Sequence, residues 1–196
     1  MNDHKGFFAM MARMKYIERW ALMRNSVSEN ICEHSLEVAM LAHGFGIIGR
    51  NRFGKDLSPE RLAMLGMYHD CTEIITGDMP TPVKYANDEL KEAYKAIEDS
   101  AAHRLLEMLP EDLRAEYESY FLPEQITPEE YRYVKAADKL SALIKCIEEE
   151  KTGNQEFRSA KQATYESLQQ MNMPEVTVFC EVFLPEYYKT LDELEH

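Results

Sequence analysis

Four residues of this chain are of the types that bind a divalent transition metal, and they lie in three separate segments. His34 comes first, His69 and Asp70 follow side by side, and Asp138 comes much later. Two imidazoles and two carboxylates suit a transition ion better than Ca²⁺, which prefers oxygen ligands alone. Closed structural zinc sites usually use several thiolates, so a set without thiolates indicates a catalytic ion. A six-coordinate ion would keep two positions for water and a substrate oxygen, which suits hydrolysis of a phosphate ester.

Two acids and an arginine could assist such a hydrolysis. Glu73 follows Asp70 by three residues and could accept a proton from water or orient it, and Asp78 could protonate the leaving alkoxide. The two acids could also exchange these roles. Arg19 could pair with phosphate oxygens through its fork of donors. Each has a simpler interpretation as well: Glu73 as a solvated acid at a helix end, Asp78 as a turn residue, and Arg19 as a surface cation.

The single tryptophan is a candidate for contact with a substrate. Trp20 offers a flat apolar wall for a sugar or a base, although a lone tryptophan more often fills a core. Lys84, Arg24 and Thr81 are weaker candidates of the same kind.

The elements that must position these residues have helical patterns. Positions 34, 38, 41, 45 and 48 are His, Val, Leu, Phe and Ile, which share one face of a helix that runs to about residue 50. His34 is therefore expected to point inward with core residues. A histidine on such a face is more often a hydrogen-bonded core residue than a ligand, so the metal interpretation of His34 depends on the rest of the set.

A second helix is predicted to begin at the capped start Ser58-Pro59-Glu60 and to carry His69 inward. If this helix continues, Glu73 overhangs His69 and Asp70. Gly77 and the prolines at 80 and 82 are expected to end regular structure, which leaves a loop over residues 76–85 beside the metal.

Asp138 belongs to a long helix that opens at the capped start Thr127-Pro128 and continues to about Lys151. It lies at the edge of an apolar stripe, which is an expensive place for a carboxylate unless something positive faces it. Phe179 and Phe183 recur at helical spacing, so a helix is favoured over a strand there. Further helices are expected over about residues 5–17, 88–108, 110–122, 155–170 and 175–189. These patterns predict an all-α fold.

The length and charge of the chain exclude several classes of function. A chain of 196 residues is expected to form one domain with a substantial core. Its net charge of −13 repels nucleic acid polymers and anionic membranes. There is no apolar run of about 20 residues that could cross a bilayer, and no signal peptide pattern, so we expect a cytoplasmic protein. Residues 194–196 look like the remnant of an expression tag.

The four cysteines form no CxxC pair and are interpreted as reduced thiols. An alternative zinc site of Cys32, His34, His69 and Cys71 can be drawn from the sequence. Cys32 and His34 are two residues apart, however, and a regular helix would point them roughly 200° apart. This alternative is therefore disfavoured.

Longer stretches around the candidate residues carry a family resemblance. They include Arg19-Trp20, Leu22-Met23-Arg24-Asn25, Glu33-His34-Ser35-Leu36, Tyr68-His69-Asp70, Thr76-Gly77-Asp78, Pro80-Thr81-Pro82-Val83-Lys84-Tyr85 and Lys135-Ala136-Ala137-Asp138. Together they resemble the bacterial 5′-deoxynucleotidases of the HD superfamily of metal-dependent phosphohydrolases. The resemblance covers essentially the whole chain, and it is specific because the Arg-Trp pair and the loop are not general features of the superfamily.

The resemblance implies a single HD domain over residues 1–193 that forms a homodimer. It implies hydrolysis of deoxyribonucleoside 5′-monophosphates with one divalent ion, Co²⁺ or Mn²⁺ rather than Mg²⁺. In this sequence the ion would be held by His34, His69, Asp70 and Asp138.

The resemblance also assigns roles to the residues around the ion. Arg19 would orient the phosphate, Glu73 and Asp78 would serve the proton transfers, and Trp20 would line the sugar pocket and help to exclude ribonucleotides. The complete set implied to contact substrate is Arg19, Trp20, His34, Asp70, Asp78, Met79, Pro80, Thr81, Lys84 and Asp138.

Two other functions remain open at this point. The first is another HD hydrolase, either a nucleoside triphosphohydrolase or a phosphodiesterase, although the chain is short for the extra domains of many such enzymes. The second is a nucleotide-sensing helical module without turnover. The presence of Glu73, Asp78 and Arg19 together weighs against that module.

Overall fold

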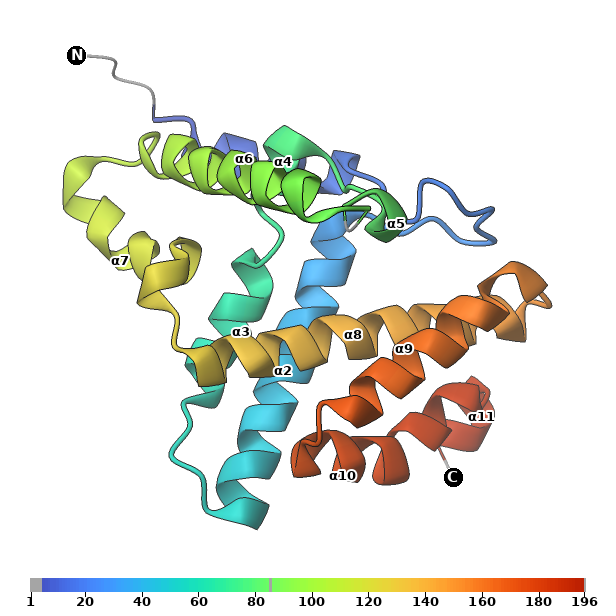
Figure 1. Ribbon diagram of the computed structural model, residues 1–196. Coiled ribbons are helices and arrows are strands. Elements are labelled where there is room, and N and C mark those ends of the chain that lie inside the picture. Colours follow the sequence, from blue (N-terminus) through green and yellow to red (C-terminus); the bar gives the residue numbers. More distant parts are fainter. Residues whose placement is uncertain (1–4, 85, 196) are drawn as a thin grey trace.

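The computed structural model describes residues 5–84 and 86–195, and within these ranges it consists of helices and contains no strand (Figure 1). The predicted all-α fold is confirmed, including the helix in place of a possible strand before Phe179. Tyr85 of the predicted loop, His196 of the predicted tag remnant and residues 1–4 lie outside the described ranges. Among the described helices, none combines the length and the apolar character that crossing a bilayer requires.

In chain order the helices are α1 Phe7–Met11, η1 Ala12–Tyr16, α2 Ile31–Phe53, α3 Pro59–Tyr68, α4 Glu73–Thr76, α5 Thr81–Lys84, α6 Asp88–Leu106, α7 Glu111–Phe121, η2 Pro123–Gln125, α8 Pro128–Lys151, η3 Gln155–Phe157, α9 Arg158–Gln170, α10 Pro174–Val182, η4 Leu184–Tyr188 and α11 Leu191–Leu194, where η denotes a 3₁₀ helix.

The two longest helices begin at capping boxes. The Asn30 side chain accepts hydrogen bonds from the first-turn amides of α2, and Glu33 reaches back to the Asn30 amide. Thr127 and Glu130 make the same reciprocal pair at the start of α8. The ends of α2 and α8 that the site depends on are therefore defined by local sequence.

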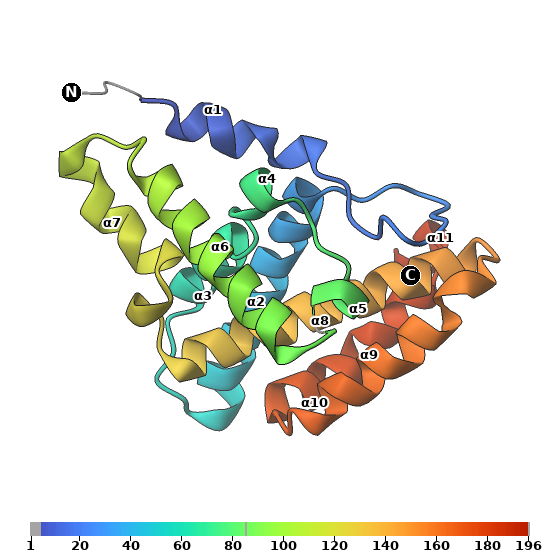
Figure 2. The same ribbon diagram turned by 45° about the horizontal axis from the view of Figure 1, so that its top comes forward.

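The main core lies where α2, α3 and α8 meet, and Figure 1 shows α2 crossing α8 steeply. Its buried side chains include Phe45, Leu65, Leu140 and Ile144. A second cluster, centred on Phe7, lies under α1, α6 and α7. Figure 2 shows α1 and α7 on the opposite side of the molecule from α9 and α10. The candidate ligands lie at the start of α2, in the turn that directly follows α3, and in the middle of α8.

A close contact between α2 and α3 brings two of the candidate segments together. A Cβ atom added at Gly66 would lie 3.0 Å from the backbone of Ala39, so only glycine allows this approach without a shift. His69 follows Gly66 by three residues, and His34 precedes Ala39 on α2. The small residue therefore sets how near the two histidines can come.

The structure differs from the sequence-based expectations in two places near the site. The helix of His69 does not continue to Glu73: α3 ends at Tyr68, and the chain turns before α4 begins. The turn is stabilised by tight backbone bonds, including the Glu73 amide to the Asp70 carbonyl at 3.0 Å. Glu73 nevertheless lies beside the site, because the turn directs the chain back toward His69 and Asp70.

The expected irregular loop over residues 76–85 contains a short helix, α5. The Pro80 carbonyl accepts from the amides of Val83 and Lys84, at 2.8 and 3.0 Å. Proline is tolerated in the first turn of a helix, where its missing amide is not needed. Pro82 therefore starts a turn of helix here instead of ending regular structure.

Candidate metal centre

His34 is buried in α2 and its ring is oriented by a hydroxyl of α8. Its Nδ1 lies 2.9 Å from Ser141 Oγ, and that hydroxyl donates to Glu37 Oε2 at 2.5 Å. Because Ser141 has one proton and gives it to Glu37, its oxygen must accept from Nδ1 of His34. The lone pair of the imidazole is then on Nε2, which is the arrangement of a metal ligand.

His69 is oriented in the same way at the end of α3. Its Nδ1 lies 2.7 Å from the carbonyl oxygen of Gly66, which can only accept a hydrogen bond. The Nε2 atom of His69 therefore carries the lone pair. The Nε2 atoms of His34 and His69 are both buried and have no hydrogen-bond partner. Two such orphaned acceptors, with ring centroids 5.2 Å apart, fit a bound cation.

Two carboxylate oxygens complete the cluster. Asp70 Oδ2 lies 3.5 Å from Nε2 of His34 and 3.1 Å from Nε2 of His69. Asp138 Oδ1 lies 3.3 Å from Nε2 of His34 and 4.0 Å from Nε2 of His69. Ligand atoms around an ion with bonds of about 2.1 Å are about 3.0 to 3.4 Å apart. The four residues therefore have the types and most of the spacing that one ion requires.

Neighbouring side chains lower the pKa values of both carboxylates in the cluster. Burial would raise the pKa of Asp70, but His69 and His34 hold that pKa well below its usual range. Burial also opposes ionisation of Asp138, but Lys135 and His34 hold its pKa well below its usual range. Lys135 Nζ donates to Asp138 Oδ2 at 2.8 Å. It is the positive partner that the position of Asp138 at the edge of an apolar stripe requires.

Arg19 and Trp20 lie beside the cluster on the segment before α2. Arg19 Nη1 donates to Asp70 Oδ2 at 3.4 Å, and its Nε lies 3.4 Å from Glu29 Oε2. Trp20 Nε1 donates to the same Glu29 oxygen at 2.7 Å, and its ring packs against Phe157 with centroids 5.3 Å apart. Arg19 is thus in direct contact with one of the candidate ligands, and Trp20 is its immediate neighbour.

Glu73 and Asp78 both lie near the cluster, in different environments. Glu73 is buried, its Oε2 has no hydrogen-bond partner, and burial together with Asp70 and Asp78 raises its pKa to about 9. Asp78 is half-buried, and burial raises its pKa, while Arg19 opposes that rise. The simpler interpretation of Glu73 as a solvated acid is wrong, since its side chain is hidden from water.

The remaining loop candidates are less closely tied to the cluster. Met79 and Pro80 are half-buried, and Thr81 is exposed. Lys84 donates to Glu98 of α6 at 2.8 Å. Arg24 is exposed, and its backbone amide donates to Glu156.

The alternative zinc site is not formed. Cys32 is exposed on α2 while His34 is buried, as the helical spacing requires. Cys71 is buried in the second hydrophobic cluster, and burial raises the pKa of its thiol well above the usual range. Among the described residues, the potential metal-ligand atoms of His34, His69 and Asp70 all lie within 4.8 Å of one another, and this group includes neither cysteine.

Sequence reasoning missed two residues that orient the site. Ser141 could have been found, because it follows Asp138 by three residues and shares its helix face. Glu29 could not, because it reaches Arg19 and Trp20 through an isolated antiparallel bridge between Glu18 and Asn30. No spacing rule predicts that bridge.

Comparison with solved structures defines the class of the fold. An HD-domain phosphohydrolase (lin2634) from Listeria innocua superimposes with a TM-score of 0.77 at 24% identity, covering 96% of this chain and 91% of that one. The cyanophage S-2L HD phosphohydrolase (DatZ), solved with dA and one catalytic Zn²⁺ ion, gives a TM-score of 0.63 at 23% identity, covering 93% and 96%. The protein has the all-α fold of the HD-domain phosphohydrolases.

Comparison of sequences then gives the family. The model of the YfbR-like 5′-deoxynucleotidases matches residues 6–187. The 5′-deoxynucleotidase of Vibrio cholerae is 47% identical over 188 residues, covering 96% of this chain and 97% of that protein. The 5′-deoxynucleotidase YfbR of Shigella boydii is 45% identical, covering 96% and 94%. This chain therefore belongs to the YfbR-like 5′-deoxynucleotidase family, and the predicted family is confirmed.

Proposed function

We propose that this protein is a 5′-deoxynucleotidase that hydrolyses deoxyribonucleoside 5′-monophosphates to deoxyribonucleosides and phosphate, with a divalent transition ion held by His34, His69, Asp70 and Asp138. Its family supports hydrolysis of nucleotide 5′-monophosphates. One structural observation carries the metal assignment: two buried, unpartnered imidazole nitrogens face two carboxylate oxygens at 3.1 to 4.0 Å.

The charge of the cluster also favours a cation. Although burial and Arg19 lower the pKa of His34, the carboxylates of Asp138 and Asp70 raise it to about 10, so without an ion the cluster would draw in a proton. A divalent ion would supply that positive charge and leave the imidazole neutral. When bound, it lowers the pKa of a water molecule and stabilises charge on a phosphoryl group. We expect Co²⁺ or Mn²⁺ to serve better than Mg²⁺, since imidazole is a softer ligand than oxygen.

Arg19 is suited to bind the phosphate. Its guanidinium remains charged, because Asp70 and Glu29 raise its pKa despite burial. The fixed fork of donors matches phosphate oxygens, and the contact with Asp70 aims the fork toward the cluster. Arg19 would therefore orient the phosphate for in-line attack.

Glu73 and Asp78 would serve the two proton transfers. One accepts a proton from the attacking water and the other gives a proton to the leaving 5′-oxygen. The buried, unpartnered Oε2 of Glu73 is available for such an exchange. Burial raises the pKa of Asp78 and Arg19 opposes that rise, and Asp78 lies on the loop that would cover the sugar.

Trp20 would form a wall of the sugar pocket, and Met79, Pro80, Thr81 and Lys84 would complete the substrate contacts. A 2′-hydroxyl pressed against a closely fitting wall without a partner costs about 1 to 3 kcal/mol. This cost allows roughly tenfold or greater selection against ribonucleotides. We further expect one domain over residues 1–193 that assembles as a cytoplasmic homodimer.

The test is phosphate release from a panel of dNMPs, rNMPs, dNTPs and cyclic nucleotides with Co²⁺, Mn²⁺ or Mg²⁺. We expect dNMPs to be the preferred substrates. Preference for dNTPs or cyclic nucleotides would establish the alternative HD hydrolase instead. Glu73→Ala should reduce turnover strongly, and equal rates for this variant and the parent would contradict the assigned role of Glu73. Family membership weighs against the sensing module.

A further inference from the structure

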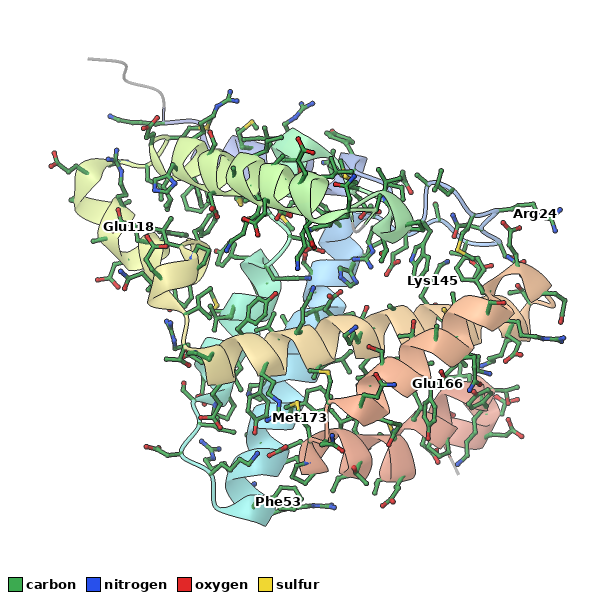
Figure 3. The ribbon with its side chains drawn as sticks, in the orientation of Figure 1. Arg24, Phe53, Glu118, Lys145, Glu166 and Met173 are labelled. Carbon is green, nitrogen blue, oxygen red and sulfur yellow. The ribbon has the colours of Figure 1, made fainter. Side chains whose placement is uncertain are left out.

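The segment that carries Arg19 and Trp20 contains no helix, so its shape depends on tertiary contacts. We call residues 19–27 the strap; it connects η1 to α2. Trp20 has a φ of 61°, a left-handed conformation that residues with a side chain keep only when surrounding contacts impose it. Figure 2 shows the strap extending over the C-terminal end of α8. In Figure 3, Arg24 lies at the outer end of the strap, and Lys145 lies on α8 beneath it.

A buried carboxylate of α8 binds the returning half of the strap. Glu149 is 1% exposed. Its oxygens accept from the amide of Ser26 at 2.8 Å, the amide of Val27 at 3.2 Å and Nδ2 of Asn154 at 2.8 Å. Nζ of Lys145 donates to Glu149 and to the Val27 carbonyl. Each of these partners of Glu149 is a donor, which suits an ionised carboxylate that only accepts hydrogen bonds.

The same cluster reaches Trp20 by two routes. Asn154 also donates to the carbonyl of Arg24 at 2.8 Å, which ties down the outer end of the strap. Lys145 lies 5.8 Å from the ring centre of Phe157, and this ring packs against Trp20. Contacts with residues at the end of α8 therefore position both the backbone that follows Trp20 and the Phe157 ring that packs against it.

We propose that Glu149 is a positioning residue of the nucleotide site: it fixes the strap on α8 and thereby sets where Trp20 stands relative to the ligands. α8 also carries Asp138, about 16 Å away along the same rigid helix. The helix α8 would thus position both a ligand of the ion, through Asp138, and the wall of the sugar pocket, through Glu149. This inference rests on the proposed function, and it makes discrimination between deoxyribose and ribose depend on a carboxylate that does not touch substrate.

The principal test is Glu149→Gln, which keeps the shape but turns an NH₂ group toward donors. We expect the ratio of kcat/KM for dAMP over AMP to fall by about threefold or more, because a loosened wall tolerates the 2′-hydroxyl better. Trp20 is the single tryptophan, so its fluorescence reports on the strap directly. Without substrate, its acrylamide quenching should increase about twofold and its emission should shift to the red. Glu149→Asp, which keeps the charge, should recover part of both effects.

Glu175→Gln is the matched control. Glu175 is also buried, and it accepts from Lys55 Nζ and Tyr133 Oη, both at 2.8 Å, near the other end of α8. This variant should lose comparable thermal stability but keep the parental substrate ratio and Trp20 quenching. Asn154→Ala provides a second, uncharged perturbation of the strap and should act in the same direction as Glu149→Gln. It remains informative if Glu149→Gln does not fold.

The inference is overturned if Glu149→Gln, or Asn154→Ala in its place, keeps the parental substrate ratio and the parental quenching. It is equally overturned if Glu175→Gln produces the same losses, because a general loosening of the protein would then explain them. Failure of the parent to hydrolyse dNMPs would count against the proposed function alone. In that case the quenching of Trp20 still decides whether Glu149 holds the strap.

Discussion

At the scale of single residues, the site combines ligands with residues that orient them. Each candidate imidazole presents Nε2 to the centre because its Nδ1 is occupied, in His34 by Ser141 and in His69 by the Gly66 carbonyl. Lys135 likewise binds Oδ2 of Asp138, and Oδ1 of Asp138 faces the centre of the cluster. Two buried imidazole nitrogens, Nε2 of His34 and Nε2 of His69, are left without a hydrogen-bond partner, an unfavourable arrangement that a bound cation would offset. The ligand assignment can therefore be tested one side chain at a time.

Replacing Asp138 with Asn should remove one charged ligand while keeping the shape of the side chain. We expect the affinity for Co²⁺ or Mn²⁺ to fall by more than about 100-fold, since even supporting residues of metal sites cost about 10- to 100-fold. Titration calorimetry on metal-free protein measures this directly. Glu148→Gln, an exposed acid on the same helix, is the control and should bind metal like the parent. Equal metal affinity in Asp138→Asn would remove Asp138 from the ligand set.

Glu29 is a second target at this scale, because one of its oxygens serves both Arg19 and Trp20. In Glu29→Gln an uncharged amide replaces that carboxylate, so Arg19 loses a charged partner. We expect kcat/KM for dNMPs to fall about tenfold, which corresponds to one impaired charge-assisted interaction. The exposed Glu18 provides the comparison, and Glu18→Gln should retain parental kinetics. Parental kinetics in Glu29→Gln would mean that Arg19 is oriented without it.

At the scale of elements, the decisive contact is the approach of α2 to α3. Gly66→Ala would place a Cβ atom 3.0 Å from the backbone of Ala39 and push the two helices apart. We expect a loss of about 1 to 3 kcal/mol in the free energy of unfolding, together with reduced activity, because His69 moves with α3. Gly44→Ala is the matched control, since no atom lies within 4 Å of the added Cβ. It should be neutral or more stable by about 0.5 to 1 kcal/mol. Denaturant unfolding distinguishes the two variants.

The elements also show what could be predicted from sequence. The helices α2 and α8 were predictable, because capping boxes and apolar periodicity are local signals, and the helical phase alone turns His34 inward. The end of α3 at Tyr68 and the short α5 were not, because a turn and a proline-led helix depend on bonds to nearby backbone that propensities do not resolve. The role of Glu149 could not be predicted, since the strap amides that it binds, those of Ser26 and Val27, lie more than 120 residues earlier in the chain.

At the scale of the whole molecule, buried charge makes stability depend on pH. Burial opposes ionisation of Glu149, but Lys145, Asn154 and the strap amides lower its pKa from 4.5 to about 2. A lowered pKa means that Glu149 stabilises the fold above about pH 4.5 and that this contribution is lost as the pH falls toward 2. The difference in unfolding free energy between the parent and Glu149→Gln should therefore shrink by roughly 2 kcal/mol between pH 6 and pH 3. A difference independent of pH would contradict the ionised state of Glu149.

Metal removal should also affect the whole fold, because the cluster joins α2, α8 and the turn that follows α3. An ion bound only by the folded state adds about 2.7 kcal/mol when it is present at 100 times its dissociation constant. We expect dialysis against a chelator to lower the Tm, and added Co²⁺ or Mn²⁺ to restore it. His69→Ala should abolish this metal-dependent shift. A Tm unaffected by chelation and metal addition in the parent would argue that the cluster does not bind an ion tightly.

The residues of α8 that contact the candidate metal centre or the strap lie in a single row along the helix. Asp138, Ser141, Lys145 and Glu149 follow one another at steps of three, four and four residues. One residue inserted between the first and the last of them would rotate one end relative to the other by about 100°. Among related enzymes, this stretch should therefore accept many exchanges of side chain but almost no change in length.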